Sequence, residues 1–167
     1  MRRRYVIESV NGRHDLKSFR CGTPAIDDVL NDHDRLSAYG KTYVVVFHPG
    51  ASEVLACFTL LPDLQEVVAP TGGFPAVLLN ILAVDHKHQR KGIGKWILSQ
   101  LILDIVNLAT PEATPYLLIE PIDDEASAYY QYLDIGFVRL SDGKLVLPMD
   151  TMRQAVIAAR EGVPPEH

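Results

Sequence analysis

The 167-residue chain has few cysteines, no excess of basic charge and no long apolar run. Its two cysteines, Cys21 and Cys57, lie far apart, which excludes a disulfide framework and a four-cysteine zinc site and indicates reduced thiols in a cytoplasm. No apolar stretch is long enough to span a bilayer, and Glu8 and Asn11 interrupt a start that otherwise resembles a signal peptide. No membrane partner is expected. The net charge of −5 also argues against binding nucleic acid through bulk charge, although a local basic patch is not excluded.

The pattern of apolar residues predicts alternating strands and helices in one domain spanning residues 1–167. Strands are predicted over residues 3–10, 41–48, 54–62, 76–84, 114–121, 136–140 and 144–149, and helices over residues 21–40, 92–107, 123–134 and 149–162. The order β-α-β-β-β-α-β-α-β-β-α indicates a mixed α/β fold with one central sheet. Because a helix separates residues 76–84 from residues 114–121, we expect these two strands to be parallel, and the first of them to be buried on both faces.

The stretch DHKHQRKGIGKW, residues 85–96, joins a strand to a helix. A helix that begins directly after a strand offers free backbone N–H groups and the positive end of its dipole, which together attract anions. Gly92 and Gly94 would let a phosphate approach the backbone, while Arg90, Lys91 and Lys95 add positive charge. The residues alone leave two readings open, an anion site and a plain turn with solvated cations.

Three named motifs fail at this turn. A P-loop requires glycine where Gln89 stands and serine or threonine where Trp96 stands. A dinucleotide fingerprint requires a third glycine where Ile97 stands. His86 and His88 lack a third ligand at a recognisable spacing, so no metal is predicted.

A fourth pattern fits, because residues 89–94 match Q/R-x-x-G-x-G/A. With the preceding strand, residues 82–98 (LAVDHKHQRKGIGKWIL) resemble the acyl-CoA-binding segment of the GCN5-related N-acetyltransferase (GNAT) superfamily, and the predicted element order agrees with that fold over most of the chain. The resemblance implies acetyl-CoA as co-substrate. Its pantetheine arm would lie along Leu82, Ala83 and Val84. Its pyrophosphate would bind Gln89, Arg90, Lys91, Gly92, Ile93, Gly94 and Lys95.

A second, weaker resemblance lies near the N-terminus. The stretch FRCGTPAIDDVL, residues 19–30, is similar to the toxin-like branch of the superfamily, whose members can acetylate aminoacyl-tRNA. The acidity of the chain does not favour tRNA, although Arg2, Arg3, Arg4 and Arg20 could form a basic face.

Three functions follow from these resemblances. The first is an N-acetyltransferase in which a primary amine of unknown identity attacks acetyl-CoA directly in a ternary complex. The alternatives are a tRNA-directed acetyltransferase toxin and a non-catalytic CoA-binding regulatory module. Homodimers are common among such proteins, so a homodimer stays an option.

The resemblance also implies where the chemistry occurs. The backbone N–H of Val84 would stabilise the oxyanion, and a tyrosine on the helix at residues 123–134 would protonate the leaving thiolate. Counting forward from Glu120 selects Tyr130, which we favour, whereas counting back from Gly136 selects Tyr132. Glu120 is the candidate general base, with an ordered water as the alternative.

Overall fold

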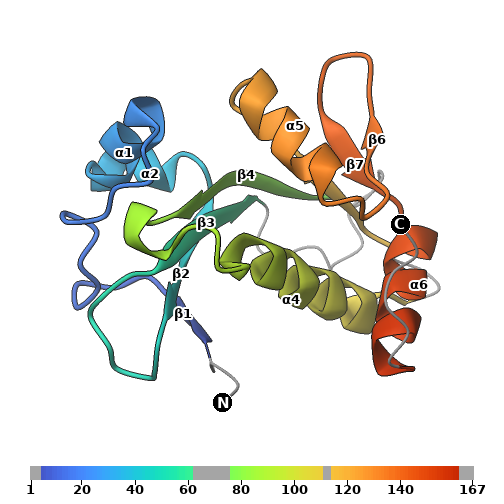
Figure 1. Cartoon of the computed structure of the whole chain (residues 1–167), viewed down its shortest axis with the longest axis horizontal. Helices are drawn as coiled ribbons and strands as arrows, with labels where there is room; N and C mark the ends of the chain where they lie inside the picture. Colours follow the sequence, from blue (N-terminus) through green and yellow to red (C-terminus); the bar gives the residue numbers. More distant parts are fainter. Residues whose placement is uncertain (1–4, 62–75, 111–113, 162–167) are drawn as a thin grey trace. The chain divides into compact units, whose positions relative to one another are not determined.

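The computed structural model describes residues 5–61, 76–110 and 114–161. Within these ranges the strands follow the order β1-β2-β3-β4-β5-β7-β6 in a mixed sheet (Figure 1). The strands are β1 (Val6–Ser9), β2 (Lys41–Val46), β3 (Ala56–Leu61), β4 (Ala76–Val84), β5 (Tyr116–Ile119), β6 (Val138–Arg139) and β7 (Leu145–Leu147). The helices are α1 (Pro24–Leu30), α2 (His33–Ser37), η1 (His86–His88), α4 (Ile93–Leu108), α5 (Asp124–Tyr132) and α6 (Met149–Arg160). The predicted α/β class and GNAT-like order are therefore confirmed.

The single helix predicted over residues 21–40 is wrong, because the chain forms two short helices there. Asp32 has an extended backbone, and its carboxylate accepts the N–H groups of Asp34 and Arg35, which caps α2 and ends the run from α1. Pro24 begins α1, where proline is favoured, but the hydroxyl of Thr23 makes no capping bond. Local competition from a capping side chain thus overrides the apolar periodicity.

Strand β4 runs parallel to β5, as predicted, with partners from Ala76↔Tyr116 to Leu79↔Ile119. The prediction that β4 is buried on both faces is wrong, because buried and half-buried residues alternate along it. The pairing with β5 covers only the first part of β4, so residues 80–84 lack β5 partners among the residues described. The polar backbone groups of residues 80–84 therefore form no ladder hydrogen bonds with β5.

The chain divides into two compact units that interleave in the sequence. The single domain over residues 1–167 stays a prediction. The first unit comprises residues 1–61 and 80–96, and the second comprises residues 62–79 and 97–167. The core of the first unit is formed by Phe19, Val29, Leu30, Leu36, Val44, Val46, Val54, Cys57, Ile81 and Ala83. In the second unit the buried apolar side chains come from β5, β7, α6 and the continuation of α4. No helix in the described ranges is both long and apolar enough to cross a membrane.

Candidate functional site

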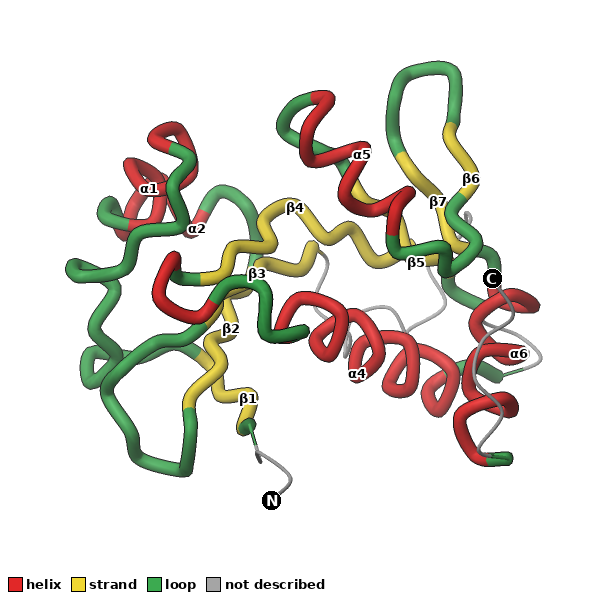
Figure 2. The backbone as a smooth tube through the Cα atoms, in the orientation of Figure 1, coloured by secondary structure: helices red, strands yellow, loops and turns green. Residues whose placement is uncertain are grey.

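The turn between β4 and α4 lies wholly in the first unit. Figure 2 follows it from the end of β4 through the single turn of η1 into α4. After η1 the backbone takes left-handed conformations at Arg90 (φ 61°) and Gly92 (φ 82°), and α4 begins at Ile93. Glycine adopts such a conformation at little cost, whereas an arginine there is uncommon and strained. The chain thus enters the helix through a constrained loop.

The backbone N–H groups at the start of α4 have no acceptor. From Arg90 to Lys95 none donates a hydrogen bond to a described residue, and the first donor of the helix is Trp96, whose N–H reaches the Gly92 carbonyl at 3.0 Å. Ile93 and Gly94 are nevertheless buried. The first N–H groups of a helix have no intrahelical acceptor, and water or an anion can take that place. The turn therefore has the donors of an anion site.

Four basic side chains surround these donors in the sequence. Lys87, Arg90, Lys91 and Lys95 are all exposed, and none of them forms an ion pair with any residue that the structure describes. Their charge is therefore available to an anionic ligand, in addition to the partial positive charge of the α4 N-terminus. The backbone supplies directed donors, and the side chains supply attraction with less geometric constraint.

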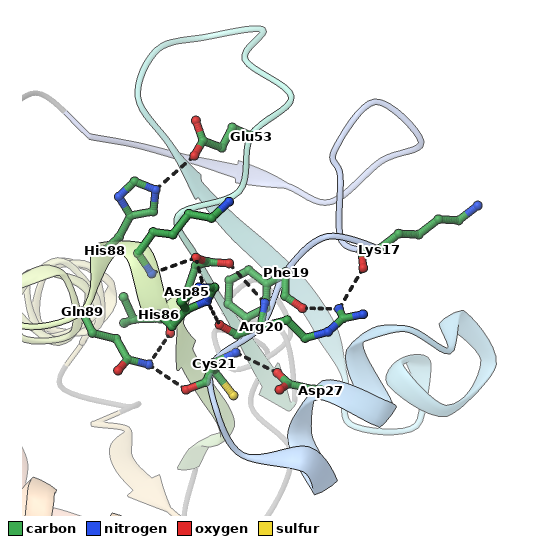
Figure 3. A network of polar contacts seen from close by, with 12 residues as sticks. Lys17, Phe19, Arg20, Cys21, Asp27, Glu53, Asp85, His86, His88 and Gln89 are labelled. Carbon is green, nitrogen blue, oxygen red and sulfur yellow. Dashed lines mark hydrogen bonds and ion pairs between the residues drawn. The ribbon is translucent and has the colours of Figure 1, made fainter.

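The side chain of Asp85 fixes the geometry of this turn through hydrogen bonds. Its side chain is buried, with only 4% of the residue exposed. One carboxylate oxygen accepts the N–H of Lys87 at 3.0 Å, and the other accepts the N–H of Arg20 at 3.1 Å (Figure 3). Asp85 thus joins the turn to a segment 65 residues earlier in the chain. No local sequence pattern indicates this contact, because the two residues are far apart in the chain.

Gln89, the first residue of the Q-x-x-G-x-G pattern, points its side chain toward protein carbonyls. Its Nε2 donates to the carbonyl of Cys21 at 2.7 Å and to that of Val84 at 2.9 Å (Figure 3). Both partners are acceptors, so the side-chain amide nitrogen must face them. Of the polar groups of Gln89, its backbone N–H and its amide oxygen are left for a ligand.

The segment held by Asp85 and Gln89 is Phe19–Cys21. Phe19 is buried in the core of the first unit. The guanidinium of Arg20 folds back onto the carbonyls of Lys17 and Phe19, which it reaches at 2.8 and 2.6 Å. Burial raises the pKa of the half-buried Cys21 thiol to about 11, so this thiol is protonated at neutral pH. The other arginines of the proposed basic face, Arg2 to Arg4, lie outside the described residues.

The two histidines of the turn are occupied by protein partners. Nδ1 of His86 lies 3.1 Å from the carbonyl of Arg20, and Nε2 of His88 lies 3.1 Å from Glu53 (Figure 3). Across the residues that the structure describes, no group of three His, Cys, Asp or Glu side chains could hold a metal ion. The histidines thus brace the turn against neighbouring segments.

The end of β4 presents backbone groups on the side away from β3. The N–H of Ile81 donates to the hydroxyl of Thr59, and that of Asp85 donates to the carbonyl of Leu55, so odd-numbered residues face β3. Because direction alternates along a strand, the polar backbone groups of Leu82 and Val84 lie on the opposite side. Ala83, the third residue predicted to contact pantetheine, instead directs its backbone toward β3.

The residues predicted for proton transfer lie in the second unit. Tyr130 is buried on α5, with 6% of the residue exposed, and its ring packs edge-on against those of Tyr129 and Phe137. Its hydroxyl makes no hydrogen bond to a described residue, and burial, helped by the neighbouring Tyr129, raises its pKa. Tyr132 is 85% exposed at the end of the same helix. The two candidates therefore occupy very different environments.

Glu120 is exposed directly after β5. It lines a polar cavity of about 310 Å³, together with residues from the start of α5 and from the β6–β7 connection. The other residues lining the cavity are Pro121, Asp123, Asp124, Ser127, Arg139, Asp142, Gly143 and Lys144. Glu120 therefore has both water and counter-charges nearby, which fits either a base or a solvated surface carboxylate.

In comparison with known proteins, no family model matches the chain. The chain is 26% identical over 157 residues to a tRNA-acetylating toxin of Mycobacterium tuberculosis, which covers 88% of this chain and 93% of the toxin. The structure of AtaTR bound with AcCoA has a TM-score of 0.72 at 22% identity and covers 91% of this chain and 98% of that one. AtaT complexed with acetyl-methionyl-tRNAfMet has a TM-score of 0.71 at 21% identity, with 92% and 99% covered.

These similarities agree with the predicted fold. They bear out the predicted acyltransferase class and acetyl-CoA as co-substrate. They do not support the expectation that a nucleic acid is an improbable partner, because relatives include a tRNA-acetylating toxin and a tRNA complex. The chain therefore shares the fold of these solved structures and is similar over most of its length to a tRNA-acetylating toxin.

Proposed function

We propose that the protein is an acetyl-CoA-dependent N-acetyltransferase whose acceptor is the α-amino group of an aminoacyl-tRNA. The observation that carries the donor half is the run of unpaired backbone N–H groups from Arg90 to Lys95 at the start of α4. The similarity to a tRNA-acetylating toxin over most of both chains supports the acceptor half. This choice places the tRNA-directed alternative ahead of an unspecified primary amine.

The donor is held by backbone groups in this proposal. The pyrophosphate accepts N–H groups of the turn, and the basic side chains of Lys91 and Lys95 add attraction. The pantetheine arm pairs with the polar backbone of Leu82 and Val84, which faces away from β3. This mode of binding extends the sheet by one strand-like ligand and requires no particular side chain.

The chemistry is a direct acyl transfer. The neutral amine attacks the thioester carbonyl, and the N–H of Val84 stabilises the oxyanion that forms. When the intermediate collapses, the C–S bond breaks, the new amide loses a proton to water or to Glu120, and the thiolate of CoA takes a proton from a tyrosine. We favour Tyr130 over Tyr132 for this last role, because it is buried and its hydroxyl makes no hydrogen bond to a described residue, whereas Tyr132 is exposed to solvent.

The distribution of charge supports a polyanionic acceptor despite the negative total. The first unit carries twelve Lys and Arg residues against eight Asp and Glu residues, a net charge of +4. The second carries four against thirteen, a net charge of −9. The turn belongs to the positive unit. A nucleic acid that approaches the first unit therefore meets attraction, which the whole-chain value of −5 conceals.

The donor claim is tested by thermal unfolding with acetyl-CoA. A ligand that binds only the folded state raises the melting temperature by mass action. Gly94→Glu should remove this rise, because a carboxylate would occupy the phosphate position and repel the ligand. Gly12→Glu adds the same charge to an exposed loop with open space around it, and it should keep the rise. The absence of any rise for the wild type at millimolar acetyl-CoA would refute the donor claim.

The acceptor claim is tested with labelled acetyl-CoA and purified tRNA. Charged tRNA should become labelled, uncharged tRNA should not, and mild alkaline hydrolysis should release an N-acetyl amino acid identifiable by mass spectrometry. A parallel panel of a peptide, a polyamine and an aminoglycoside tests other amines. Labelling of a small amine with none on charged tRNA would refute the acceptor while leaving the transferase intact. Binding of acetyl-CoA without labelling of any acceptor would favour the non-catalytic module.

A further inference from the structure

We infer that Asp85 and Gln89 are positioning residues that couple the anion-binding turn to the Phe19–Cys21 segment, so that acyl-CoA binding and order in that segment promote each other. This inference rests on the proposed function, because it takes CoA as the ligand of the turn. It assigns the side chain of Gln89 to positioning, although its sequence motif suggests direct phosphate contact.

The coupling begins at Asp85, whose two carboxylate oxygens divide between the two elements. Oδ1 accepts from Lys87 in the turn, and Oδ2 accepts from Arg20 in the segment. The carboxylate is almost fully buried, so water cannot replace either bond without opening the structure. A shift of the turn therefore moves the acceptor of the Arg20 N–H. The bond from the His86 N–H to the Arg20 carbonyl, at 2.8 Å, ties the same two elements again.

Gln89 adds a third link next to the unpaired donors. Its side chain donates to the Cys21 carbonyl in the segment and to the Val84 carbonyl at the end of β4. Gln89 thus joins three elements, which are the strand that would pair with pantetheine, the turn that would hold pyrophosphate and the Phe19–Cys21 segment. An anion that orders the backbone after Gln89 also restrains this side chain. By thermodynamic reciprocity, order in the segment then strengthens binding of the anion.

The amides of the segment can report this coupling without touching the ligand. The N–H of Arg20 is donated to Asp85, and that of Cys21 is donated to Asp27 at 2.8 Å. Neither N–H is therefore available to CoA. Slower hydrogen exchange at these two positions when CoA binds would reflect order transmitted through the contacts of Asp85 and Gln89.

The test combines CoA binding with hydrogen exchange in the full chain. In the wild type, CoA should slow exchange at Arg20 and Cys21 by about threefold or more. Gln89→Met keeps the length of the side chain but removes both donations, so it should weaken CoA binding roughly tenfold and abolish the slowing. With charged tRNA saturating, the KM for acetyl-CoA should rise while kcat stays within about twofold. Gln154→Met alters an exposed glutamine on α6 whose side chain makes no hydrogen bond to a described residue, and it should change neither quantity.

The outcomes separate this inference from the proposed function. If the wild type binds CoA but exchange at Arg20 and Cys21 is unchanged, the coupling is wrong and the donor site stands. If Gln89→Met binds CoA as tightly as the wild type, Gln89 has no positioning role. If the wild type does not bind CoA at all, the proposed function fails and this inference fails with it. The exchange measurement on the wild type needs no variant, so a poorly folded variant cannot decide the result.

Discussion

Replacing Asp85 by alanine should destabilise the protein more than a typical capping residue does. The carboxylate accepts two backbone N–H groups, at 3.0 and 3.1 Å, and only 4% of the residue is exposed. An unsatisfied buried donor costs roughly 1–3 kcal/mol, so the loss of both acceptors should lower the free energy of unfolding by about 2–4 kcal/mol. Asp85→Asn should cost about half as much, because the amide keeps one acceptor and turns its NH₂ group toward the other donor.

Asp32 provides a matched control, since it also accepts two backbone N–H groups, at 3.1 and 3.3 Å. It is exposed and its partners are local, so Asp32→Ala should cost only about 1 kcal/mol and Asp32→Asn close to nothing. Urea unfolding at neutral pH measures all four variants by linear extrapolation. If Asp85→Ala costs no more than Asp32→Ala, the carboxylate does not hold the turn as argued, and the coupling of the turn to Arg20 loses its main support.

Two further predictions concern catalysis and acceptor binding. Tyr130→Phe retains the ring packing and removes only the hydroxyl, so kcat in steady-state assays should fall by roughly 10²–10⁴-fold. Tyr132→Phe should change kcat by less than about threefold. If the two variants rank in the reverse order, Tyr132 and not Tyr130 is the proton donor. Arg35 and Arg160 are exposed arginines in the last turns of α2 and α6, one in each unit. Arg35→Gln should raise the KM for charged tRNA by about twofold at low salt, and Arg160→Gln should leave this KM unchanged. If both variants raise the KM equally, the charge difference between the units has no role in binding tRNA.

Much of the fold followed from local pattern because most elements have strong periodicity or β-rich composition. The parallel pairing of β4 with β5 followed from the length of the intervening helix. The break between α1 and α2 was missed because Asp32 reads as one polar residue in an amphipathic run, and only the geometry reveals it as a cap. Sequence pattern registers apolar periodicity well, but it does not decide when a side chain competes with the backbone.

For the candidate site too, only the features within one short stretch of sequence could be predicted. The glycines and the helix start predicted an anion site because these features lie within one short stretch of sequence. The hydrogen bonds that hold Phe19–Cys21 could not be predicted, because they join residues more than 60 positions apart. No sequence pattern around Asp85 or Gln89 indicates a contact with this segment. Residues 19–22 (FRCG) stand out in the sequence only through their resemblance to the toxin-like branch. Their backbone carbonyls and N–H groups, which every sequence has, make the contact.

The net charge of a whole chain is a poor guide to its acceptor for a physical reason. A polyanion responds to the potential within about a Debye length, roughly 8–10 Å at physiological salt, and not to the sum over a whole chain. Thirteen of the 21 acidic residues belong to the second unit, whereas the turn belongs to the first. The exposed cations Lys87, Arg90 and Lys91 belong to the unit with a charge of +4. An acidic protein can thus attract tRNA through one unit while the other keeps its total charge negative.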